Sequence, residues 1–177
     1  MSGFIDFSLD DSIEGTPSKK HLPLLIELVP QTSWGDNLRS RLQKKDWDRL
    51  RKGQARWAGW HCEICGQSGK DQGYKWPVEC HEVWSYDDEN HIQKLDRLIS
   101  LCPLCHKVKH YGRTFNVEGH EGALAALKRM MWVNGWKMKD AQAHVSEAFS
   151  IWEKRSHHVW TLDLSFLKEA GVSLFPA

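Results

Sequence analysis

Two C-x-x-C pairs constrain the fold of this chain more than any other feature of its sequence. Cys62 and Cys65 form the first pair, and Cys102 and Cys105 form the second, within 177 residues. Four thiolates at this spacing can close a tetrahedral cage around zinc, and the closed shell leaves no open position for water. Gly66 follows the first pair and permits the unusual backbone of a tight knuckle. The sequence therefore predicts a structural zinc site.

Cysteine usage and hydropathy indicate where such a protein resides. The chain has five cysteines, an odd number, and the metal-type spacing of four of them argues against a secreted disulfide framework. No apolar run approaches the roughly 18 residues that a membrane span needs, and the N-terminus lacks a basic region followed by an apolar stretch. We therefore expect a cytoplasmic protein with no membrane partner. Nothing in the sequence identifies a dimer interface.

Apolar periodicity predicts an α+β fold that is mainly helical, with helices on both sides of the cysteine-rich segment. The apolar run Leu22–Val29 suits an edge strand or an extended packing segment. The expected divisions are a flexible arm over 1–20, a helical extension over 21–58, a cysteine and histidine module over 59–113, and a second helical extension over 114–177. The expected elements are helices over 37–58, 121–133 and 139–155, a loop over 112–119, a turn at 134–135, a strand over 159–164 and a short helix over 166–170.

Charge and tryptophan content each leave two interpretations. Basic residues outnumber acidic ones between Asp36 and Arg56, although the net charge of the chain is only +1. This stretch suits either a solvated helix face or a phosphate contact, and neither interpretation is favoured. The ten tryptophans can stack nucleic-acid bases, but most are expected to be core anchors, Trp34 among them.

Three histidines lie close to the cysteine pairs in sequence. His106 and His110 are four residues apart, so a helix presents them on one face, where two imidazoles can chelate one ion. His81 lies between two acidic residues, Glu79 being two positions before it and Glu82 directly after. These residues are the candidates for a second, functional site.

The segments Glu79–Trp84 and Leu98–His106 together resemble the HNH endonuclease family of the ββα-metal, or His-Me finger, nucleases. The resemblance extends over about Cys62 to His110. It implies a β-hairpin followed by a helix, which together hold one catalytic divalent metal ion beside the four-cysteine zinc knuckle. The ion itself is open between zinc, nickel, manganese and magnesium.

The resemblance also assigns roles to individual residues. His81 corresponds to the general base that activates water, a task that suits histidine because its ordinary pKa is near 6.5. His106 corresponds to the metal ligand that follows the last cysteine, and His110 to the additional ligand of colicin-type members. Basic residues near this segment are candidates for contacts with nucleic acid: Lys107, Lys109, Arg113 and Arg97.

Two positions depart from the family pattern. Cys80 stands where most relatives carry an aspartate or histidine metal ligand. Cys80 either binds the catalytic ion, which would favour zinc or another late transition metal, or is a buried small hydrophobe, in which case Glu79 can assist the site. Arg97 stands five residues before Cys102, in the position of the asparagine that orients the loop and the base.

These observations predict a metal-dependent DNA endonuclease of the zinc-containing HNH type. The alternative is a zinc-stabilised nucleic-acid-binding module that does not cleave. A protein-interaction adaptor built on the zinc knuckle also fits the near-neutral charge, but it gives no role to the three histidines.

Overall fold

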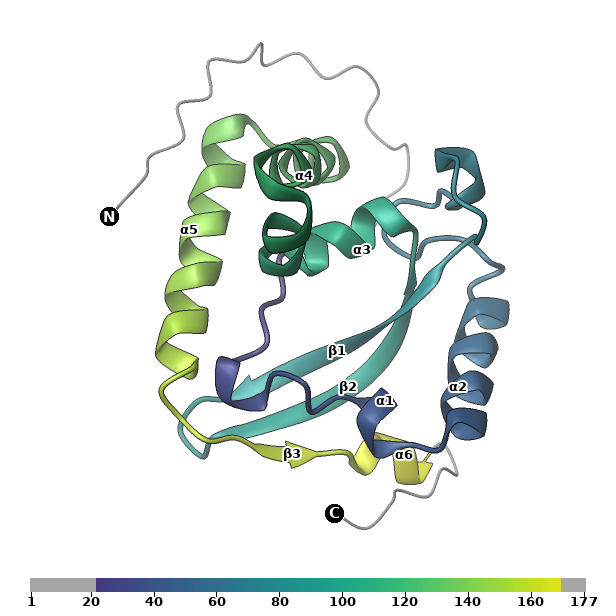
Figure 1. The fold of residues 1–177 in the computed structure, drawn as a ribbon, viewed down its shortest axis with the longest axis vertical. Coiled ribbons are helices and arrows are strands. Elements are labelled where there is room, and N and C mark those ends of the chain that lie inside the picture. The colour runs from purple at the N-terminus through teal and green to yellow at the C-terminus, as the bar shows by residue number, and fades with distance from the viewer. Residues whose placement is uncertain (1–21, 170–177) are drawn as a thin grey trace.

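A computed structural model of the chain describes residues 22–169, and a long β-hairpin lies at its centre (Figure 1). Strands β1 (Glu79–Asp87) and β2 (Ile92–Leu101) pair antiparallel, and the short β3 (Thr161–Asp163) pairs parallel with the other edge of β2. Helices precede and follow this sheet. The fold is therefore α+β and mainly helical, as the sequence predicts. The predicted arm over 1–20 lies outside the described residues.

The register of the hairpin determines which side chains share a face. Glu79 pairs with Leu101, His81 pairs with Ile99, and a bulge interrupts the register between Val83 and Trp84. Because side chains alternate along a strand, Glu79 and His81 project from one face of β1 while Cys80 projects from the other.

Helix α3 (Pro103–Lys109) follows β2 directly, which completes a ββα unit. Pro103 occupies the first helical turn, where its missing N–H costs nothing, and Cys102 precedes it as the N-cap residue. The helix packs beside β1 (Figure 1). His106 lies within α3, and His110 is its C-cap residue.

Helix α4 (Tyr111–Asn134) packs against α3, and α5 (Met138–Arg155) packs against α4 (Figure 1). Residues 111–118 are helical, so the predicted loop over 112–119 is wrong. Gly119, with φ of 67°, interrupts the helix at the end of that segment. Gly135, with φ of 66°, adopts the left-handed conformation that ends α4, which confirms the predicted turn.

The N-terminal segment from Leu22 to Pro30 is extended and pairs with no strand. Its backbone N–H groups donate to three different places: Leu24 to the side chain of Asn134, Ile26 to Nε2 of His144, and Glu27 to the carbonyl of Lys109. Of the two interpretations of this segment, the extended packing segment is therefore confirmed, and the edge strand is wrong. It brings the side chain of Glu27 to the ββα unit.

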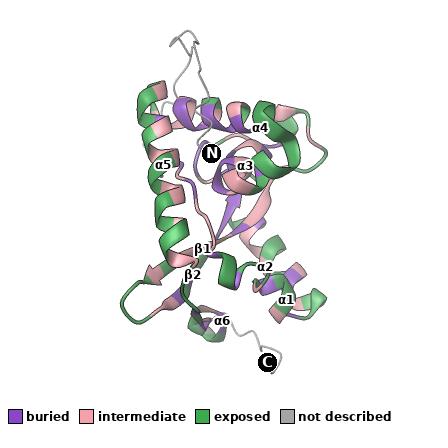
Figure 2. Ribbon diagram, turned by 60° about the vertical axis from the view of Figure 1, so that its left-hand side comes forward, coloured by how far each residue is buried: buried purple, intermediate pink, exposed green. Residues whose placement is uncertain are grey.

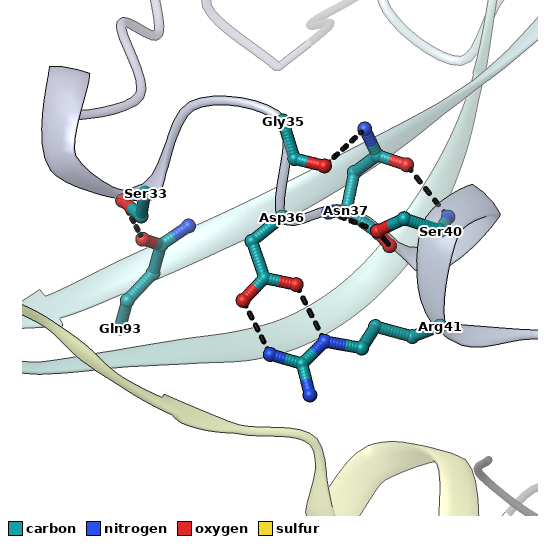
Figure 3. A network of polar contacts seen from close by, with 7 residues as sticks. All are labelled: Ser33, Gly35, Asp36, Asn37, Ser40, Arg41 and Gln93. Atoms are coloured by element: carbon teal, nitrogen blue, oxygen red, sulfur yellow. Dashed lines mark hydrogen bonds and ion pairs between the residues drawn. The ribbon is translucent and has the colours of Figure 1, made fainter. Parts of the chain in front are cut away.

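The helix predicted over 37–58 is two helices, α1 (Leu38–Arg41) and α2 (Lys44–Trp57), preceded by the 3-10 turn η1 (Gln31–Ser33). Leu42 and Gln43 between them are extended. Figure 3 shows the polar network that fixes this region. Asn37 and Ser40 form a reciprocal capping box at the start of α1, and Arg41 binds back to the carboxylate of Asp36 with two hydrogen bonds. Ser33 donates to Gln93 on β2.

Two apolar clusters lie on opposite faces of the hairpin, and Figure 2 shows the buried residues along it. The first cluster joins the N-terminal segment, α3 and α4, and it includes the four paired cysteines. The second joins α1, α2 and the C-terminal α6 (Ser165–Glu169) to β2 through Leu95 and Leu98. A second 3-10 turn, η2 (Lys70–Gln72), lies in the loop that precedes β1.

Tryptophan burial agrees with the prediction only in part. Trp47 and Trp160 are buried, but Trp34 is 74% exposed, so its assignment as a core anchor is wrong. Trp57, Trp60 and Trp76 are also exposed. Within the described part of the chain, no helix combines the length and the apolarity that crossing a membrane requires.

Candidate metal centres

The four paired cysteines meet in a buried cluster. The Sγ atoms of Cys62, Cys65, Cys102 and Cys105 all lie within 4.8 Å of one another. The first pair sits in a knuckle in which the Gly66 N–H donates to the Cys62 carbonyl at 2.8 Å, and Gly66 has φ of 74°. The second pair lies at the N-cap and in the first turn of α3.

An arginine that sequence reasoning missed supports the view that these sulfurs carry negative charge. Arg129 on α4 donates to Sγ of Cys65 at 2.9 Å and to Oε1 of Gln67 at 2.9 Å. Its guanidinium also lies over the ring of Trp132, 4.5 Å from the centroid. Hydrogen bonds among the thiols lower the pKa of Cys102 and, through Cys102, raise the pKa of Cys62 and Cys105, so negative charge is concentrated on Cys102. Four buried sulfurs with a cationic neighbour fit a structural metal such as zinc.

The three histidines also converge. Nδ1 of His81 lies 3.2 Å from Nε2 of His110, which lies 3.1 Å from Nε2 of His106. These nitrogens form the second group of candidate metal ligands in residues 22–169. Because β1 and α3 pack together, two histidines on a helix and one on a strand reach the same point. The four-residue spacing of His106 and His110 was enough to predict that they lie together. His81 was added to them only by the resemblance to the HNH family.

Carboxylates behind two of the rings determine which nitrogens face the centre. Nε2 of His81 donates to Oε2 of Glu27 at 2.8 Å, and Nδ1 of His106 donates to Oε2 of Glu79 at 2.5 Å. A neutral imidazole carries one proton, so in that form Nδ1 of His81 and Nε2 of His106 present lone pairs to His110. The single neutral ring of His110 can donate to only one of them.

A divalent cation fits this group of lone pairs. Imidazole nitrogens about 2.0–2.1 Å from a tetrahedral ion lie roughly 3.3–3.4 Å apart, close to the observed separations. Burial lowers the pKa of His81, and burial together with the nearby His106 and His81 lowers the pKa of His110 to about 3. Both rings are therefore neutral at physiological pH, the form that ligates metals.

Glu27 contacts the histidine cluster, although no local sequence pattern indicates this. Its second oxygen accepts from Nζ of Lys109 at 2.5 Å, so one carboxylate joins His81 to the end of α3. Burial raises the pKa of Glu27, but the hydrogen bond from His81 and the charge of Lys109 outweigh it and leave the pKa below its ordinary value. The carboxylate is therefore ionised.

Cys80 is not part of the histidine cluster. It projects from the opposite face of β1 and packs against the second apolar cluster. Burial, followed by the charge of Glu82, raises the pKa of its thiol to about 12. Of the two interpretations of Cys80, the structure supports the small hydrophobe. Glu79, by contrast, contacts the site through His106.

The four basic residues expected to contact nucleic acid are in different environments. Lys109 is buried and paired with Glu27, so it does not present a surface charge, and the expectation for this residue is wrong. Lys107 is partly exposed and paired with Glu118 at 2.8 Å. Arg113, in the first turn of α4, and Arg97, on β2 opposite Val83, are exposed.

Comparison of the chain with protein-family models, with curated protein sequences and with solved structures finds no match.

Glu27→Gln is expected to weaken metal binding at the histidine cluster roughly 10- to 100-fold. The amide can still accept from His81, but it no longer supplies the negative charge that makes the imidazole a stronger ligand. Titration of the metal-free cluster with Co²⁺, followed by its visible absorption, measures the affinity.

Lys109→Met is the matched control for this experiment. It removes the other partner of the same carboxylate and leaves the bond between Glu27 and His81 in place. We expect an affinity within a few-fold of the unaltered protein. An equal loss in both variants would mean that the Glu27–Lys109 pair acts by holding α3, and not through the imidazole.

Proposed function

We propose that this protein is a metal-dependent endonuclease of the HNH type, which hydrolyses phosphodiester bonds in DNA. The convergence of three imidazoles on a ββα unit, beside a buried four-cysteine cluster, carries the proposal. The zinc cage has no open position, so the chemistry is assigned to the histidine cluster.

In this proposal His81, His106 and His110 hold one divalent ion, and Glu27 and Glu79 fix two of the rings. Three protein ligands leave positions for a water molecule and a phosphate oxygen. The bound ion would act as a Lewis acid toward the phosphate and would lower the pKa of the water. In this proposal partly exposed Lys107 and exposed Arg113 would hold the flanking phosphates.

The role of His81 within this proposal differs from the sequence prediction. Its side chain is 4% exposed, its Nε2 is occupied by Glu27, and its Nδ1 faces the other two rings. This geometry favours a third ligand over a general base that acts on water from outside the metal site. Three nitrogen ligands also favour zinc or nickel over magnesium, which prefers oxygen.

Plasmid cleavage tests the proposal. Protein that retains its thiolate-bound zinc is supplied with Zn²⁺, Ni²⁺, Mn²⁺ or Mg²⁺ and incubated with supercoiled DNA. We expect nicked or linear product with a transition metal and little with magnesium. His106→Ala should lower the rate at least about 100-fold, because the site loses a ligand.

His61→Ala serves as the control, since His61 is exposed and its ring bonds only to the nearby Gly59 carbonyl among the side-chain contacts described. It should cleave at the unaltered rate. DNA binding without cleavage in any metal would favour the non-catalytic module. Failure to bind DNA at low salt, with a protein partner recovered instead, would favour the adaptor.

A further inference from the structure

The loop that precedes β1 alternates aromatic and basic side chains beside the histidine cluster. Lys70, Tyr74, Lys75 and Trp76 all belong to it. Trp76 is 46% exposed, and the centroid of its ring lies 5.8 Å from that of Tyr74.

Trp76 is connected to the metal site through one carboxylate. Its Nε1 donates to Oε1 of Glu79 at 3.1 Å, while Oε2 of the same carboxylate accepts from His106. The hydrogen bond from His106 lowers the pKa of Glu79, and Trp76 and Arg113 lower it further. The indole is therefore two hydrogen bonds away from a predicted metal ligand.

The loop is held rigidly enough to present this ring in one place. The N–H of Gly69 donates to the Pro77 carbonyl at 2.5 Å, and the N–H of Tyr74 donates to the Gly69 carbonyl at 2.9 Å. A Cβ at Gly69 would collide with the Trp76 carbonyl oxygen and would lie 2.8 Å from Cδ of Pro103, the first residue of α3. Only glycine allows this close contact between the loop and the metal-binding helix.

Cations lie next to the aromatic pair. Nζ of Lys107 lies 6.0 Å from the centroid of Tyr74, and Lys70 and Lys75 are exposed on the loop itself. Trp76 is exposed and Tyr74 is half-buried, and aromatic rings interleaved with lysines suit a strand whose phosphates meet the cations and whose bases stack on a ring. A base inside a duplex is already stacked on its neighbours, so its face is not available to the indole.

From these contacts we infer that Trp76, supported by Tyr74, stacks an unpaired base beside the histidine cluster, and that the preferred substrate is single-stranded DNA. The part of the inference that names a substrate rests on the proposed function. Its binding component stands without cleavage, because stacking needs no reaction.

Equilibrium binding by fluorescence anisotropy tests the inference without any added divalent ion. The probes are a labelled oligothymidylate of about ten nucleotides, an abasic strand with the same number of phosphates, and a duplex of the same length. The protein should bind oligothymidylate about 5- to 150-fold more tightly than the abasic strand, from a stacking contribution of about 1–3 kcal/mol. Duplex binding should be weaker than that of the single strand.

Trp76→Ala should remove this difference and leave abasic binding nearly unchanged, and Trp76→Phe should retain part of it. Trp34→Ala is the matched control, since Trp34 is the more exposed indole and lies between η1 and α1. Equal affinity of the unaltered protein for thymidylate and abasic strands would overturn the inference, even if Trp76→Ala failed to fold. So would equal loss of both strands in Trp76→Ala, or tighter binding of the duplex.

The two proposals fail separately. Base-dependent binding without cleavage in any metal would remove the nuclease and keep the stacking site. Cleavage of plasmid DNA with no preference between the thymidylate and abasic strands would keep the nuclease and remove the stacking site.

Discussion

Replacing Cys105 with serine should unfold the domain at room temperature instead of merely lowering its stability. The thiol is fully buried in the first apolar cluster, where α3 meets the knuckle of Cys62 and Cys65. Zinc binding to four thiolates contributes about 10–16 kcal/mol in small zinc domains, whereas a whole domain is stable by only about 5–15 kcal/mol. If the variant loses its zinc, it therefore loses free energy comparable to the entire stability.

Metal analysis and far-ultraviolet circular dichroism measure this outcome. We expect Cys105→Ser to lose thiolate-bound zinc and most of its helical signal, and a strong chelator to do the same to the unaltered protein. Cys80→Ser is the matched control, because Cys80 lies outside the four-cysteine cluster and packs against the second apolar cluster. It should keep its zinc and lose about 1 kcal/mol of stability, the cost of a hydroxyl in an apolar contact. A folded, zinc-free Cys105→Ser protein of normal melting temperature would contradict a structural metal site.

Local spacing explains why much of the site could be predicted. The spacing within each cysteine pair predicts a zinc site, and the four-residue spacing of His106 and His110 predicts that both face one ion. Once β1 is known to be a strand, side-chain alternation places Glu79 and Cys80 on opposite faces. The sequence alone left Cys80 undecided, because either face of the strand could be the metal face. The observed hairpin register decides this.

Long-range contacts explain what could not be predicted. Glu27 lies 54 positions before His81 and reaches it only because the N-terminal segment runs across the end of α3. Arg129 reaches the cysteines from a helix that begins after the ββα unit. Neither residue belongs to a motif with fixed spacing, and hydrophobic periodicity carries no information on such polar partners.

Errors in the elements have local physical causes. The capping box of Asn37 and Ser40 supports a one-turn helix that ends at Arg41, whereas the periodic apolar residues suggested a single long helix. Tryptophan count could not distinguish core anchors from surface rings. Trp47 fills the second cluster, while Trp76 uses its indole N–H on a carboxylate at the surface.

His81→Ala is expected to abolish binding of the ion at the histidine cluster while the thiolate-bound zinc remains. The variant removes the ligand that β1 contributes and leaves two imidazoles on α3, which bind a divalent ion far more weakly than three. Cleavage should fall at least about 1,000-fold, since both the ion and its orientation are lost. The retained zinc shows that the fold has survived.

Metal stoichiometry separates the two roles considered for His81. A general base can be removed at a cost of about 100- to 10,000-fold in rate while the ion stays bound, whereas a ligand cannot. The position of Nδ1, 3.2 Å from Nε2 of His110, makes His81 a member of the ligand group, and the bond from Nε2 to Glu27 leaves no second free nitrogen for water. A His81→Ala protein that bound its second ion normally and lost only rate would restore the general base. Loss of the ion together with the rate would assign all three imidazoles to the metal, and water activation to the metal itself.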